Sequence, residues 1–294
     1  MSDDATTWDF EEGAEIVPGR HALRLLGGGI RYEAYLSWDD TLYSLVVVKI
    51  LRPDRTDDER TLRGLRDEER ALRHANHPVI MRCFDAVLEG PRPHIVLEYL
   101  EGPRLSTLLR KYGTLPLEQL LPLALQLCSA LYYMSQRHMI HLDVKPRNII
   151  MAAPPRLIDL SIARSFDEAQ AVTSPIGTDA YMSPEQCRPQ DGVPIGPPAD
   201  VWGFGVTLFE SAAGYLPWPK PGNDGLGRWP QLELEPYALP DDVPDTLTKV
   251  IWACLEPEPT ERPRIDEVAE LLEPLVAALP RKPVLNRLRP RWRD

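Results

Sequence analysis

The sequence predicts an α+β fold in which an antiparallel sheet comes first in the chain and a mostly helical region follows. Up to about residue 99, apolar runs typical of strands alternate with glycine and aspartate turns, and one amphipathic helix interrupts them. From Glu101 onward the pattern is one of helices and loops. A chain of 294 residues is near the upper limit for a single core, so one large two-lobed unit or two small domains would fit.

Each strand and helix follows from a local pattern. Strands are expected at residues 21–26, 32–38, 42–50, 82–88 and 93–99, the first three as a meander joined by Gly27-Gly28-Gly29 and Asp39-Asp40. Helices are expected at residues 58–74, about 117–137, 200–214 and 265–277. In the first helix Leu62, Leu65 and Leu72 recur at helical intervals, and the third is apolar throughout and should be buried.

Composition excludes several classes of protein. A net charge of −11 argues against a protein that binds duplex nucleic acid. No apolar run approaches the ~18–20 residues that a membrane span needs, and the acidic first 20 residues lack a secretory pattern, so a cytoplasmic location is expected. The four cysteines are too widely spaced for a zinc site or a disulfide framework.

The two ends of the chain differ in charge. Residues 1–18 are expected to form an acidic tail, and residues 279–294 a basic one. The basic residues are Arg281, Lys282, Arg287, Arg289, Arg291 and Arg293. Such a run is either a solvated end or a contact for an acidic partner or lipid.

Two segments carry residues suited to phosphate and metal chemistry. Lys49 ends an apolar strand, and Glu68 on the following helix is a plausible counter-charge. Further on, His141, Asp143, Lys145 and Asn148 fall within eight residues between apolar anchors, a composition suited to a rigid polar loop. Eleven residues after Asn148, and directly after another apolar strand, Asp159 supplies a second hard oxygen ligand for Mg²⁺.

These segments, in this order, resemble a Hanks-type bacterial serine/threonine protein kinase over residues 19–278. The resemblance implies a two-lobed fold, with an N-lobe at residues 19–99 and a C-lobe at residues 100–278. Its motifs are Gly27-Gly28-Gly29 for the glycine-rich loop, Val46–Lys49, His141–Asn148 for the catalytic loop, Asp159-Leu160-Ser161, Gly177–Glu185, Asp200–Gly205 and Arg262. Arg262 is expected to pair with Glu185.

The resemblance also implies the roles of single residues. Asp143 would accept or orient the proton of the substrate hydroxyl, while Lys145 neutralises the γ-phosphate of ATP. Asn148 and Asp159 would hold Mg²⁺, and Lys49, fixed by Glu68, would hold the α- and β-phosphates.

The nucleotide itself would be held by two further groups of residues. Gly27, Gly28 and Gly29 would cover the phosphates. The adenine would meet the backbone at residues 98–100, with the gatekeeper behind it and apolar side chains around it. These positions are Leu97, Glu98, Leu100, Ala34, Val47 and Ile150. Lys145 together with Thr178 is the pattern of kinases that act on serine or threonine of proteins.

Three departures from the family bear on turnover and control, and two more compensate each other. Leu142 replaces the catalytic-loop arginine that pairs with a phosphorylated activation segment, so control by such phosphorylation should be weak, with Arg164 as a weaker partner. Tyr32 and Ser161 stand where the family has glycine. Ala34 and Val47 interchange the usual large and small residues on the adenine, which roughly conserves volume.

Two other functions remain open from the sequence. The three departures would suit a pseudokinase, a binding or scaffolding module without turnover. A small-molecule phosphotransferase of the same fold is the second alternative, but residues 177–185 resemble a segment that receives a peptide.

Overall fold

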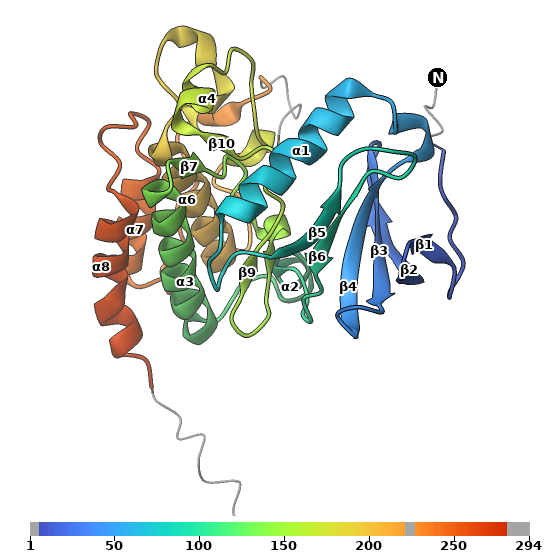
Figure 1. Ribbon diagram of the computed structural model, residues 1–294. Helices are drawn as coiled ribbons and strands as arrows, with labels where there is room; N and C mark the ends of the chain where they lie inside the picture. Colours follow the sequence, from blue (N-terminus) through green and yellow to red (C-terminus); the bar gives the residue numbers. More distant parts are fainter. Residues whose placement is uncertain (1–5, 221–226, 281–294) are drawn as a thin grey trace, which may run out of the picture.

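A six-stranded antiparallel sheet forms one side of the protein and a group of helices forms the other (Figure 1). The structure is a computed structural model that describes residues 6–220 and 227–280. The strand order in the sheet is β1-β2-β3-β4-β6-β5. The strands are β1 (Glu15–Val17), β2 (Arg20–Gly28), β3 (Tyr32–Asp39), β4 (Ser44–Leu51), β5 (Cys83–Val87) and β6 (His94–Glu98). The five expected strands are confirmed, and β1 is an addition.

Side chains of β4 alternate between two faces of the sheet, as the pleat requires. Val46, Val48 and Ile50 are buried on the outer face, away from the helical part. Val47 and Lys49 lie on the inner face, where Val47 packs against the main hydrophobic core. The sheet therefore presents its functional residues toward the rest of the molecule.

The outer face of the sheet is covered by the beginning of the chain. Trp8 and Phe10 stack on one another with ring centroids 5.7 Å apart and pack against the core that contains Ile16 and Val17. The indole of Trp8 donates to the carbonyl of Leu51 at 2.7 Å. Part of the segment expected as an acidic tail therefore packs on the sheet through its apolar residues, while its acidic character stays as the sequence gives it.

The helical part begins after β6 and is built around one apolar helix. Its helices are α2 (Leu105–Tyr112), α3 (Leu117–Gln136), α4 (Phe166–Gln170), α5 (Pro184–Cys187), α6 (Pro197–Ala213), α7 (Asp245–Cys254) and α8 (Ile265–Ala277). Two short antiparallel pairs join β7 (Met139–Ile140) to β10 (Arg164–Ser165), and β8 (Ile149–Ile150) to β9 (Arg156–Leu157). Trp202, Phe204 and Phe209 of α6 are fully buried, which confirms the expected buried helix.

Helix α1 (Glu59–His74) belongs to the sheet side of the molecule and lies close to the helical part in Figure 1. Its Leu62, Leu65 and Leu72 enter the main core, as the periodicity predicts. Among the described residues the four cysteines are free, and no helix is long and apolar enough to cross a membrane. The expected basic tail lies outside the described residues apart from residues 279 and 280.

The covering of the sheet by its N-terminal segment can be tested by unfolding. Trp8→Ala should lower the free energy of unfolding by about 2 kcal/mol, because it removes a half-buried indole and its hydrogen bond. Urea denaturation followed by circular dichroism measures the change. Glu12→Ala, at an exposed position of the same segment, is the control and should alter stability little. Equal effects of the two substitutions would contradict this packing.

Candidate active site

One buried carboxylate fixes the start of the polar loop between β7 and β8. Asp200, in the first turn of α6, accepts hydrogen bonds from the backbone nitrogens of His141 and Leu142, each at 2.7 Å. Leu142 has a φ of 65°, a left-handed conformation that costs a non-glycine residue about 1–3 kcal/mol. The two bonds to Asp200 fix this conformation, and the loop that follows is thereby placed relative to α6.

Asp143 is the centre of a compact hydrogen-bond network. Its Oδ2 accepts from Lys145 Nζ at 2.5 Å and from Asn148 Nδ2 at 2.9 Å. Its Oδ1 accepts from the Thr178 hydroxyl at 2.7 Å, and Lys145 Nζ also reaches that hydroxyl at 2.5 Å. The carboxylate is thus oriented by three partners, and a hydroxyl from a distant segment lies directly on it.

Asp159 and Asn148 offer oxygen atoms to a cation. Asp159 has a φ of 66°, and its Oδ1 is buried and accepts no hydrogen bond from the described residues. Burial alone would raise the pKa of Asp159, but the charge of Lys49, with Nζ 3.9 Å from Oδ1, lowers that pKa. Asn148 uses Nδ2 toward Asp143, so its Oδ1 is the atom available to a metal. One or two protein oxygens completed by substrate phosphates are the usual ligands of Mg²⁺, so this donor set fits that ion.

Lys49 forms a tight ion pair with Glu68 of α1. Its Nζ lies 2.8 Å from Oε1 and 2.6 Å from Oε2 of the glutamate, which is almost fully buried. Burial alone would lower the pKa of Lys49, but the charges of Glu68 and Asp159 outweigh it and raise that pKa. Lys49 is therefore a fixed cation between the sheet, the helix and the carboxylate of Asp159.

The glycine-rich turn joins β2 to β3. Gly27 and Gly28 end β2, and the backbone nitrogen of Gly29 donates to the carbonyl of Tyr32 at 3.0 Å. A Cβ atom at residue 28 would lie 2.7 Å from that same carbonyl, so the turn requires glycine there.

The residues expected around adenine come from both parts of the molecule. Val47 and Leu97 are paired across β4 and β6, and Leu97 is buried. Leu100 and Ile150 pack half-buried against the same core, and Ala34 lies half-buried on β3.

Glu98, which ends β6, accepts a 3.4 Å hydrogen bond from Arg156 of β9. This hydrogen bond therefore links the sheet to the helical part at the start of the expected hinge, residues 98–100.

The three departures from the family each make a definite contact. Leu142 is buried in an apolar cluster with segments far apart in the sequence. The cluster consists of Ile140, Leu142, Ala169, Ile195 and Ala199, with Ile162, Phe166, Val172 and Ile176 packed against it. Ser161 hydrogen bonds to Asp159 and helps to lower the pKa of that carboxyl. Tyr32 places its ring over Lys49, 4.7 Å from Nζ to the ring centroid.

A salt bridge links α1 to the segment that follows Asp159. Arg70 of α1 lies 3.0 Å from the Glu168 carboxylate of α4, and it also bonds to Asp67 at 2.8 Å. Glu168 is itself part of a capping box with Ser165. This ion pair is partly exposed.

Two residues that position the site were missed in the sequence. Asp200 was expected as the start of a buried helix that resembles a family motif, without a role in the site, because its place beside the loop depends on the tertiary fold. Gln186 donates through Nε2 to the carbonyls of Leu142 and Ile176, each at 2.9 Å, and no sequence signal marks it. The expected pair of Arg262 and Glu185 is confirmed, at 2.7 and 2.9 Å.

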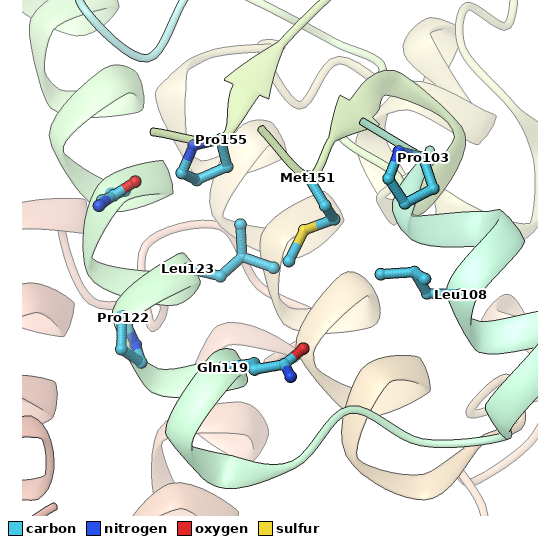
Figure 2. A pocket seen from close by; sticks show the side chains of 8 residues that line it. Pro103, Leu108, Gln119, Pro122, Leu123, Met151 and Pro155 are labelled. Atoms are coloured by element: carbon cyan, nitrogen blue, oxygen red, sulfur yellow. The ribbon is translucent and has the colours of Figure 1, made fainter. Parts of the chain in front are cut away.

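A cavity of about 330 Å³ lies elsewhere, between α2 and α3 (Figure 2). Leu108, Leu123 and Met151 point toward its interior, and the Oε1 of nearby Gln126 accepts no hydrogen bond from the described residues. None of the candidate site residues lines this cavity, so it is separate from the site.

The sequence is similar to those of known proteins. The model of the family described as "Protein kinase domain" matches residues 20–271. Serine/threonine-protein kinase PknB of Mycobacterium tuberculosis (strain H37Rv) is similar at 33% identity over 250 residues, 81% of this chain and 40% of PknB. The probable serine/threonine-protein kinase PkwA of Thermomonospora curvata is similar at 35% identity over 235 residues, 78% of this chain and 30% of PkwA. The chain therefore spans well under half the length of these curated relatives.

The buried pair of Arg262 and Glu185 can be tested by removing one charge or both. Arg262→Met should lower the free energy of unfolding by about 3–5 kcal/mol, because the 1% exposed side chain of Glu185 would keep its charge without a partner. Chemical denaturation measures the loss. Adding Glu185→Gln should recover part of it, and Arg264→Ala, at an exposed position, should alter stability little. A double variant as unstable as the sum of two independent losses would refute the argument.

Proposed function

The chain belongs to the protein kinase family, and we propose that it transfers the γ-phosphate of ATP to serine or threonine hydroxyls of proteins. One observation carries the proposal: the carboxylate of Asp143 holds the hydroxyl of Thr178 at 2.7 Å, with Lys145 on both groups. A substrate hydroxyl in a comparable position would have its proton acceptor and a neutralising cation already in place.

Each residue of the site has a distinct task in this proposal. Asp143 orients the attacking hydroxyl and accepts its proton, and Lys145 neutralises charge on the transferred phosphoryl group. Lys49, held by Glu68, binds the α- and β-phosphates. Mg²⁺, bound to Asn148 and Asp159, would neutralise phosphate charge and align the groups that react.

The remaining site residues would hold the nucleotide. The backbone at Gly27, Gly28 and Gly29 covers the phosphates, and Leu97 lies behind the adenine. Ala34, Val47, Leu100 and Ile150 contact the ring, and the backbone at Glu98 and Leu100 binds its edge. Val47, Leu97, Leu100 and Ile150 all pack against the main core between the sheet and the helical part.

The choice of serine or threonine rests on Thr178. Its hydroxyl bonds to both Asp143 and Lys145, and this geometry supports an acceptor site formed around a small aliphatic hydroxyl. The same segment, residues 177–185, is fixed by Gln186 and by the Glu185 pair with Arg262, which favours a peptide acceptor over a small molecule.

The pseudokinase alternative is less well supported than turnover. Ser161 adds a hydrogen bond to Asp159, Leu142 is satisfied by apolar packing, and Tyr32 leaves the Lys49–Glu68 pair intact. None of the three substitutions removes an atom that the reaction needs.

We also propose that activity depends only weakly on phosphorylation of the segment after Asp159. Where the family has an arginine that binds the phosphate, this chain has Leu142 in an apolar cluster with Phe166, Ala169 and Ile176 of that segment. The Arg70–Glu168 ion pair adds a second link without phosphate. The segment is thus held by contacts that are present in the unmodified protein.

Loss of a phosphate or metal contact should abolish transfer without unfolding the protein. Lys49→Met and Asp159→Asn should each reduce the rate by ~10²-fold or more, because positioning and electrostatics supply most of the rate. Mass spectrometry after incubation with Mg·ATP would detect phosphoserine or phosphothreonine, with Asp143→Asn as the inactive control. Full turnover in Lys49→Met would sink the mechanism, and an inactive wild type would favour the pseudokinase.

The weak dependence on phosphorylation predicts a contrast within one segment. Thr173 and Ser174 are exposed, and replacing both by alanine should leave most of the rate, since an exposed pair between a phosphate and Arg164 contributes only ~0–1 kcal/mol. Thr178→Ala should lower the rate strongly, because it removes both hydroxyl contacts. Initial rates on a model protein substrate measure both. A collapse in the double alanine variant, together with an equal loss of rate when a phosphatase removes phosphate from the wild type, would contradict the weak dependence.

A further inference from the structure

Tyr32, the first residue of β3, makes contacts that no glycine could make at the end of the glycine-rich turn. Its ring lies over the Lys49 ammonium, and its phenol oxygen donates to the carbonyl of Thr61 in α1 at 3.4 Å. Residue 32 therefore connects the turn, the site lysine and the helix that carries Glu68.

The register of β3 with β4 places the Tyr32 ring near Lys49. In the pairing of β3 with β4, Tyr32 lies opposite Leu51 and Ala34 lies opposite Lys49. Residues 32 and 49 are thus diagonal neighbours on one face, a separation that an aromatic side chain can span.

Helix α1 provides room for the phenol. Thr61, Gly64 and Glu68 follow helical spacing and share one face of α1. A Cβ atom at Gly64 would lie 3.2 Å from the Tyr32 hydroxyl. The absence of a side chain at residue 64 therefore accommodates the tyrosine.

The two contacts on α1 are well separated along its axis. Thr61 and Glu68 are seven residues apart, which corresponds to ~10 Å of helix. Leu62, Leu65 and Leu72 already pack α1 into the main core, and the contact at Thr61 adds a polar restraint that opposes rotation of the helix about the Lys49–Glu68 ion pair. The ring also covers one side of Lys49, which keeps water from that side of the ion pair.

We infer that Tyr32 is a positioning residue that fixes α1 against the sheet and keeps the Lys49–Glu68 pair assembled before nucleotide binds. The consequence for the rate rests on the proposed function, but the consequence for α1 does not. The competing interpretation is that the ring obstructs the phosphates, and it predicts changes of the opposite sign.

Two variants remove the contact by different routes. Tyr32→Ser deletes the ring without adding the backbone freedom of glycine, and Gly64→Val displaces the phenol while leaving Tyr32 in place. In both, kcat should fall about tenfold with a smaller change in KM for ATP, because assembly of the pair is disturbed more than nucleotide contact. Hydrogen exchange at the amides of α1 should accelerate, while the midpoint of global unfolding changes little.

Two further variants serve as controls. Tyr32→Phe keeps the ring over Lys49 but loses the hydrogen bond to Thr61, so both measurements should change less than they do in Tyr32→Ser. Tyr112→Ala removes an exposed tyrosine of α2 and should change neither measurement.

The outcomes separate the inference from the proposed function. Unchanged exchange at α1 in Tyr32→Ser overturns the inference, as does tighter ATP binding with a higher rate, which would identify the ring as an obstruction. A wild-type protein without turnover refutes the proposed function alone, and the exchange of α1 in Tyr32→Ser and Gly64→Val still decides the role of Tyr32.

Discussion

The geometry of the site depends on the Asp200 carboxylate at the start of α6. It binds two successive backbone nitrogens, and this holds Leu142 in a left-handed conformation from which Asp143 emerges at a fixed angle. The helix that carries the carboxylate is buried through large aromatic side chains and is therefore a rigid reference. Lys145, Asn148 and Thr178 are placed relative to this one anchor, because each of them bonds to Asp143.

Apolar packing at Leu142, and not an ion pair, makes the larger contribution to holding the segment after Asp159. Burying a leucine stabilises by roughly 1.5–3 kcal/mol, whereas a partly exposed ion pair such as Arg70 with Glu168 contributes about 0–1 kcal/mol. The apolar term dominates, and it is insensitive to ionic strength. Under the proposed weak dependence on phosphorylation, a regulator would act on something other than the charge of that segment.

Local patterns predicted most of the fold and the chemical residues, but not their supports. The apolar run of β4 identified a strand that carries Lys49, and the dense polar run identified Asp143, Lys145 and Asn148. Leu142 was recognised as a departure, yet its cluster joins three separate stretches of chain, residues 140–142, 162–176 and 195–199, which no local pattern encodes. The contact of Tyr32 with Thr61 and the cover formed by Trp8 were missed for the same reason, since both depend on tertiary packing.

The N-terminal segment that packs on the outer face of the sheet also determines where the folded unit begins. The family match begins at residue 20, but Trp8, Phe10, Ile16 and Val17 lie before it and shield Val46, Val48 and Ile50. A protein shortened to the matched residues would expose a contiguous aliphatic surface on a sheet whose first strand is also gone. Such surfaces promote self-association, so poor solubility of that shortened protein would reflect the position of the cut and not an intrinsically unstable fold.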